Sequence, residues 1–175
     1  MKNRPIACLL AFAFLATAQT FAVAAPADQI DDPGYVHWSK FKPGSSTKVL
    51  TSSETSGVKT STQITTTLLA VTPEKITVEV TSEAESSGTK LPPRTRKHDV
   101  AAKRPKPADP SLIKESKETL TFDGKSYRCT LSEETRGTLH IKTWLSDEIP
   151  GGLLKAQITD DGVSITSNLV NFKKA

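Results

Sequence analysis

The stretch that decides the fold is Leu120-Thr-Phe-Asp-Gly-Lys-Ser-Tyr-Arg-Cys-Thr-Leu131. At its centre, Asp123-Gly124 is a two-residue turn signal of the kind that closes type I′ β-hairpins. A hairpin closed there pairs Phe122 with Lys125, Leu120 with Tyr127, and Glu118 with Cys129. That register collects apolar side chains on one face, as a half-buried sheet requires. The stretch therefore predicts an antiparallel hairpin.

A second turn signal, Asp161-Gly162, lies near the C-terminus. If it closes another type I′ hairpin, Ile158 lies opposite Ile165 and Leu154 lies opposite Leu169. Both hairpins then present apolar side chains on a common face, and this agreement favours an antiparallel sheet.

The connection between these hairpins is Thr135-Arg136-Gly137, which predicts a three-residue loop with a left-handed glycine. A two-residue loop would place the charged Lys142 opposite Leu131, so the longer loop is preferred. The resulting inner face consists of Leu120, Phe122, Tyr127, Cys129, Leu131, Ile141 and Leu145. Trp144 falls on the opposite face, where either another segment such as the N-terminal turn covers it or it is an exposed contact residue.

Towards the N-terminus the chain is rich in threonine, a β-branched residue that suits strands. Candidate strands are 49–53, 60–71 and 75–82. One short helix is predicted, because Tyr35, Trp38 and Phe41 recur every three residues; Asp31 or Asp32 could cap it. The expected fold is mostly β, with eight or nine strands in a single curved antiparallel meander sheet, half-barrel-like, and one short N-terminal helix.

The N-terminus predicts export. Lys2 and Arg4 precede an apolar run, and Ala22-Val23-Ala24 is a small-x-small cleavage signal, so residues 1–24 are expected to be a cleaved signal peptide. Residues 25–34 are expected to be a flexible lead-in, and residues 35–175 a single domain. The expected location is the periplasm or the medium, with no transmembrane span after cleavage.

Charge and cysteine content narrow the function classes. The signal peptide contributes two of the formal net charge of +4, so the mature chain carries +2. So small a charge, together with export, argues against a nucleic-acid partner. Cys129 is the one cysteine that follows the signal peptide, which excludes a disulfide within the mature chain.

A basic, proline-rich segment interrupts the strand pattern at residues 90–110 and predicts a long, extended loop. It carries Lys90, Arg94, Arg96, Lys97, Lys103, Arg104 and Lys106. The two interpretations left open are a solvated insert and an element that contacts an anionic partner.

No sequence motif indicates catalysis. His37, His98 and His140 have no metal-ligand spacing, and no serine stands in a Gly-x-Ser-x-Gly elbow. No cofactor or metal is therefore expected, and the protein is predicted not to be an enzyme. A catalytic site assembled from scattered residues stays open as an alternative.

Three motifs carry a resemblance: His37-Trp38-x-x-Phe41-x-x-Gly44-Ser45, Gly124-x-x-x-x-Cys129, and Trp144-x-Ser-x-x-Ile-Pro-Gly-Gly152. Together they resemble exported bacterial proteins of unassigned function. The last motif, set in a meander with an N-terminal helix, is also similar to the half-barrel of periplasmic lipoprotein carriers (LolA- and LppX-like folds). That resemblance implies a curved sheet that wraps a helix and shelters an acyl chain.

Two binding hypotheses follow. In the first, the protein is a carrier or binding module for an apolar or lipid-like ligand, or for a lipoprotein. The contact residues would be Tyr35, Trp38, Phe41, Leu120, Phe122, Tyr127, Leu131, Ile141, Trp144 and Leu145, although the same residues could simply form a dry core. In the second, the basic segment docks on an anionic surface or an acidic partner. The sequence leaves the oligomeric state open.

Overall fold

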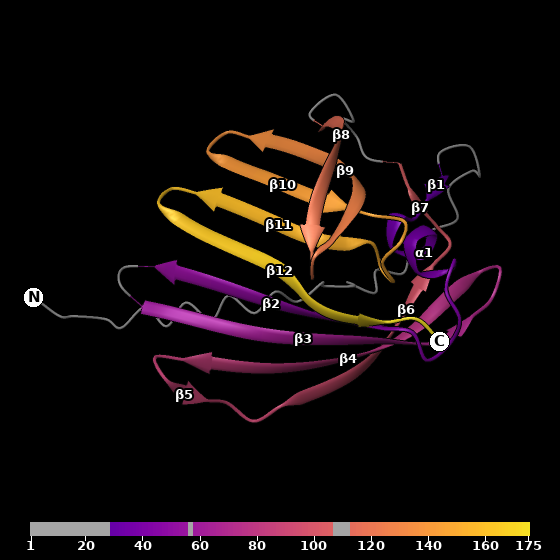
Figure 1. Ribbon diagram of the computed structural model, residues 1–175, viewed down its shortest axis with the longest axis horizontal. Coiled ribbons are helices and arrows are strands. Elements are labelled where there is room, and N and C mark those ends of the chain that lie inside the picture. Colours follow the sequence, from indigo (N-terminus) through magenta and orange to yellow (C-terminus); the bar gives the residue numbers. More distant parts are fainter. Residues whose placement is uncertain (1–28, 56–57, 107–112) are drawn as a thin grey trace, which may run out of the picture.

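The computed structural model describes residues 29–55, 58–106 and 113–175, and Figure 1 shows them as a large curved β-sheet with a short helix at one end. The predicted signal peptide, residues 1–24, lies outside the described residues. The elements are β1 (Gln29–Asp31), α1 (Pro33–Trp38), β2 (Ser46–Thr55), β3 (Val58–Val71), β4 (Lys75–Ser86), β5 (Thr89–Lys90), β6 (Arg94–Ala101), β7 (Lys103–Pro105), β8 (Ile113–Phe122), β9 (Lys125–Arg136), β10 (Leu139–Leu145), β11 (Leu153–Asp160) and β12 (Val163–Lys173).

Two meanders join to form the main sheet. Ten antiparallel strands take part, in the order β5-β4-β3-β2-β12-β11-β10-β9-β8, with β6 also paired to β4. The inner strand of the N-terminal meander is β2 and the inner strand of the C-terminal meander is β12. These two strands pair with each other in the middle of the sheet. In the described part of the chain the outer strands do not pair with each other, so the sheet stays open. The predicted fold class is confirmed.

Both predicted type I′ turns are present. Asp123 and Gly124 have φ values of 49° and 71°, and the strands pair as predicted, with Leu120 opposite Tyr127. Asp161 and Gly162 have φ values of 39° and 82°, and Ile158 pairs with Ile165. Positive φ at both central residues is what a type I′ turn requires.

The predicted three-residue loop at Gly137 is wrong. Arg136 pairs with Leu139, so the loop is the two residues Gly137-Thr138. Gly137 has a φ of 60°, which suits the first central position of a type II′ turn. Leu131 consequently pairs with Trp144 instead of Ile141.

This register also corrects the predicted inner face. Because neighbouring residues in a strand point to opposite faces, Trp144 shares a face with Leu131. Leu145 pairs with Thr130 and Ile141 pairs with Glu134, on the other face. Trp144 is therefore a core residue, 7% exposed, and Ile141 and Leu145 do not continue the face of Leu131.

Of the two predicted capping residues, Asp32 is the one that caps helix α1. The Asp32 carboxylate accepts hydrogen bonds from the backbone N–H groups of Gly34 (2.8 Å) and Tyr35 (3.2 Å), and Pro33 follows at the first helical position. The expected flexible lead-in is wrong over its described part, since residues 29–31 form β1, which pairs with β7. Among all the residues that the structure describes, no helix is long and apolar enough to cross a membrane.

The apolar side chains form two clusters. The helix cluster joins α1 to β3, β4 and β6 and consists of Trp38, Leu68, Ile76 and Val78, flanked by Tyr35, Phe41, Val71, Val80 and Val100. The strand cluster consists of Tyr127, Cys129, Leu131, Trp144, Ile149, Leu154 and Leu169, flanked by Val49, Leu120, Phe122 and Phe172. Burial of these apolar side chains stabilises the packing of the strands and of α1.

The predicted loop at residues 90–110 is also wrong over its described part. β5 and β6 pair with the same edge of β4, on either side of Pro92-Pro93, and β7 pairs with β1. The side chains of β6 project from the two faces of the sheet, and all of them except Val100 are exposed, so its charges can remain in water. That is why a strand exists here without an apolar pattern.

Candidate functional site

The apolar residues predicted to bind a ligand do not come together. Tyr35, Trp38 and Phe41 belong to the helix cluster, whereas Leu120, Phe122, Tyr127, Leu131 and Trp144 belong to the strand cluster. Ile141 and Leu145 lie on the other face of the sheet from Leu131.

Their burial shows how these residues pack. Tyr127 is 4% exposed and Leu131 is 5% exposed, because they pack against one another and their cluster. The Trp144 indole N–H donates to Glu118 Oε2 (2.7 Å), which satisfies its polar atom. This arrangement is that of a packed core.

Two hollows on the described surface are lined mostly by residues with polar side chains. One of about 530 Å³ is lined mainly by serine, threonine and charged side chains of β2, β3, β4 and β12, including Ser52, Glu54 and Lys59. The other, about 410 Å³, is lined by residues of β8, β9 and β10, including Lys114 and Glu133. Ile141 is the one aliphatic residue in the two linings, so neither hollow has the aliphatic and aromatic side chains typical of a site for an acyl chain.

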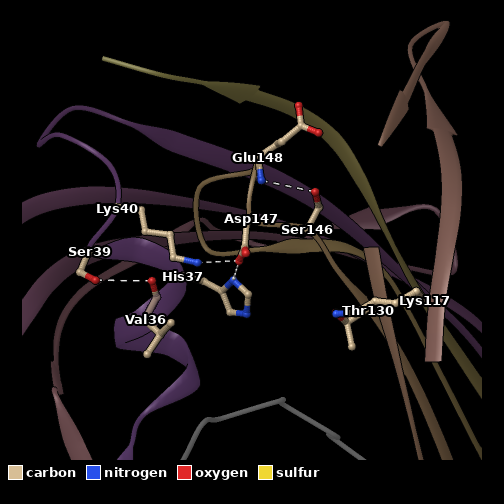
Figure 2. A network of polar contacts seen from close by, with 9 residues as sticks. All are labelled: Val36, His37, Ser39, Lys40, Lys117, Thr130, Ser146, Asp147 and Glu148. Atoms are coloured by element: carbon tan, nitrogen blue, oxygen red, sulfur yellow. Dashed lines mark hydrogen bonds and ion pairs between the residues drawn. The ribbon is translucent and has the colours of Figure 1, made fainter. Parts of the chain in front are cut away.

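A polar network joins α1 to the loop between β10 and β11 (Figure 2). Lys40 Nζ donates to Asp147 Oδ1 (2.6 Å), and His37 Nδ1 lies 3.3 Å from the same oxygen. Ser146 Oγ accepts the backbone N–H of Glu148 (3.3 Å), which helps to shape the loop.

Titration at this junction follows from its geometry. Burial lowers the pKa of His37, an effect that the nearby Asp147 carboxylate opposes. The hydrogen bond from Lys40 lowers the pKa of Asp147. The ring is therefore neutral and the carboxylate ionised at neutral pH. No nucleophile hydrogen-bonds to His37 among the described residues, so the pair does not form the arrangement that nucleophilic catalysis uses.

Two glycines let α1 approach this loop. A Cβ atom at Gly151 would lie 2.6 Å from the Trp38 ring, and one at Gly152 would lie 2.8 Å from the His37 ring. Both glycines have positive φ. Two of the motifs that carried the resemblance, His37-Trp38 and Ile149-Pro-Gly-Gly152, thus meet in space as a packing junction. Sequence reasoning identified both motifs but not their contact.

The described part of the basic segment, residues 90–106, is the strongest candidate for a contact surface. It carries seven lysine or arginine residues and a single carboxylate, Asp99. Every residue of β6 except Val100 is exposed. Asp99 already accepts hydrogen bonds from Lys75 Nζ (2.6 Å) and Thr77 Oγ1 (2.7 Å), which lower its pKa.

The basic side chains differ in their partners. Lys103 Nζ donates to Asp31 Oδ1 (2.6 Å), across the β1–β7 pair. In the described part of the chain, Arg94, Arg96 and Lys97 form no ion pair within 4 Å, although Lys97 lies opposite Glu79 in the sheet. These three cations on β6 face solvent.

Comparisons with known proteins add little. No protein-family model matches the chain, and no curated protein matches it. A DUF1329 family protein from Desulfovibrio piger is similar in structure, with 10% sequence identity and a TM-score of 0.33, over 81% of this chain and 91% of that one. That score is too low to support an argument about function, and the resemblance to lipoprotein carriers stays a prediction.

Proposed function

We propose that the protein is an exported, non-catalytic binding module whose partner is anionic and contacts the basic segment. The observation that carries the proposal is the exposed row Arg94, Arg96 and Lys97 on β6. The one carboxylate of β6, Asp99, already accepts hydrogen bonds from Lys75 and Thr77. Cations on one strand raise the local concentration of an anionic partner and steer its approach.

The other outer strand supports this choice by contrast. β8 is exposed along most of its length, but it carries Lys114, Glu115, Lys117 and Glu118, so its charges balance. Charge thus distinguishes the two open edges of the sheet, and an anionic partner prefers β6.

The test measures the binding of two charge-neutralised variants, a triple variant on β6 and a double variant on β8, to three anionic probes. The probes are vesicles containing phosphatidylglycerol, a sulfated polysaccharide, and polyglutamate. The variant Arg94→Gln/Arg96→Gln/Lys97→Gln is expected to lose salt-sensitive binding to at least one probe. The control Lys114→Gln/Lys117→Gln, on β8, is expected to bind as the wild type does. Equal binding by the wild type and the β6 variant, or no binding by the wild type, would overturn the proposal.

A carrier of an apolar or lipid-like ligand is the second proposal, supported by a curved, open sheet with two apolar clusters. Burial of Tyr127, Leu131 and Trp144 weakens it, because a ligand would have to displace packed side chains.

Native mass spectrometry of the protein from a periplasmic extract tests the carrier proposal. A co-purifying mass of lipid size, released on denaturation, would support it, and a ligand-free mass would count against it. The same spectrum tests export, because cleavage after Ala24 leaves a chain that begins at Ala25.

A further inference from the structure

We infer that β6 binds an extended acidic peptide, which adds to the main sheet as a further strand beyond β6. The inference deepens the proposed function, because it names the class of the anionic partner. It rests on the backbone of β6 as well as on its charges.

The backbone of β6 points alternately towards β4 and away from it. Antiparallel pairs alternate between hydrogen-bonded and non-hydrogen-bonded positions. The backbone N–H of Ala102 donates to the backbone C=O of Glu74 (2.7 Å). This bond marks Glu74 and Ala102 as a hydrogen-bonded pair just beyond the regular β4–β6 register. Counting back in steps of two, Arg94, Arg96, His98 and Val100 bond to β4.

The remaining residues of β6, which are Thr95, Lys97, Asp99 and Ala101, therefore direct their N–H and C=O groups outwards. The short contact between Thr95 Oγ1 and Thr81 Oγ1 (2.9 Å) agrees with this assignment, because side chains are closest at non-hydrogen-bonded pairs. The register of β6 with β4 has no bulge, so the outward groups form a regular row. A regular row of donors and acceptors is a template for another strand.

Charge selects an acidic strand. Arg94 and Arg96 point to one face of the sheet and Lys97 to the other, so carboxylates on either face of an added strand would meet a cation. The same segment already shows such a pairing, where Lys103 of β7 meets Asp31 of β1 across paired strands.

The geometry disfavours other partners. The hydroxyl or ammonium donors of lipid headgroups are mobile and do not alternate with acceptors at the spacing of a strand, so headgroups do not match the regular outward row. A second copy of this chain would bring either another basic β6 or the charge-balanced β8 to the edge. Neither complements β6 in charge.

The test uses a fluorescent decapeptide of alternating glutamate and valine as the probe. Thr95→Pro removes one outward N–H and places the proline ring in the path of the added strand, while no backbone hydrogen bond to β4 is lost; its hydroxyl contact with Thr81 is lost. Thr95→Val is the matched control, because it loses the same hydroxyl contact and keeps the N–H. We expect Thr95→Pro to weaken peptide binding about tenfold and Thr95→Val to change it less than about twofold.

A second measurement keeps the inference testable if Thr95→Pro fails to fold. The wild-type protein should bind the decapeptide about tenfold more tightly than the same peptide N-methylated at alternate residues, because methylation removes backbone donors and leaves the charge unchanged. Equal binding of the two peptides would overturn strand addition.

Three results separate this inference from the proposed function. Equal binding of the decapeptide by Thr95→Pro and Thr95→Val overturns strand addition, while loss of binding in the β6 neutralisation variant would still support an anionic partner. Preference of the wild type for phosphatidylglycerol vesicles over the peptide also overturns the inference. Self-association of the neutralisation variant, with no peptide binding by the wild type, would show that the charges only protect the edge from aggregation.

Discussion

Replacing Gly151 with alanine should destabilise the protein by about 2–5 kcal/mol, as two contributions from the structure indicate. Gly151 has a φ of 72°, where a Cβ atom costs about 1–2 kcal/mol. That Cβ would also lie 2.6 Å from the Trp38 ring, and Trp38 is only 8% exposed. Forcing a buried ring to move costs about a further 1–3 kcal/mol.

Gly124→Ala is the matched control. Gly124 has nearly the same φ, 71°, but nothing lies within 4 Å of its Cβ position. It should therefore lose only the backbone contribution, about 1–2 kcal/mol. Urea denaturation of both variants, followed by far-UV circular dichroism, gives the two free energies of unfolding.

A double variant separates strain from steric conflict. In a Trp38→Leu background the smaller side chain leaves room, so Gly151→Ala should cost about as much as Gly124→Ala does. If Gly151→Ala and Gly124→Ala agree within about 0.5 kcal/mol in the wild-type background, the packing of Trp38 against the loop is refuted as the reason for this glycine.

Three further predictions concern single side chains. Because burial lowers the pKa of His37, the folded state resists protonation of this ring. Its contribution to stability is therefore complete above the unfolded pKa of about 6.5 and declines as the pH falls below that value. His37→Gln should make the urea-denaturation midpoint depend less on pH between pH 7 and pH 5. Cys129 is 4% exposed and its pKa is raised by burial, so a thiol reagent at pH 8 should label it only as fast as the protein opens, and rapid labelling of the native protein would contradict its burial. Glu118→Ala should cost about 1–2 kcal/mol through the lost hydrogen bond from Trp144, whereas Glu115→Ala on the same strand should change stability by less than about 0.5 kcal/mol, and equal losses in urea denaturation would exclude that bond as a contributor.

Local signals predicted the parts of the fold that depend on local geometry. Asp123-Gly124 and Asp161-Gly162 each specify a turn, a register and a face, because both central positions need positive φ. Ser87-Gly88 forms a third turn of the same kind, with φ values of 48° and 79°, and the same signal could have found it.

Ambiguity at one glycine caused the main error. Gly137 fits the third position of a three-residue loop as well as the first of a type II′ turn, and the choice depends on packing elsewhere. With the two-residue loop, the strand register differs from the predicted one and Trp144 lies in the core. There the Trp144 indole N–H donates to Glu118 of β8, which is separated from β10 by β9.

The candidate surface was only half predictable. Its cations are visible in the sequence, but the strand that presents them is not, since β6 buries almost no apolar side chain and has no alternating pattern. The contact of Trp38 with Gly151 was equally hidden, because it joins segments from opposite ends of the chain.

The meeting of β2 and β12 in the middle of the sheet sets the order in which the fold can assemble. Thr51 and Ser167, which hydrogen-bond across this pair, are 116 residues apart, whereas the other neighbouring long strands belong to meanders with short connections. Contacts so distant along the chain form slowly, because a large loop must close first. Until that closure, each meander presents a bare inner edge of its own, and at high protein concentration those edges compete for strands of other molecules. Refolding should therefore be slow, and its yield should fall as the protein concentration rises.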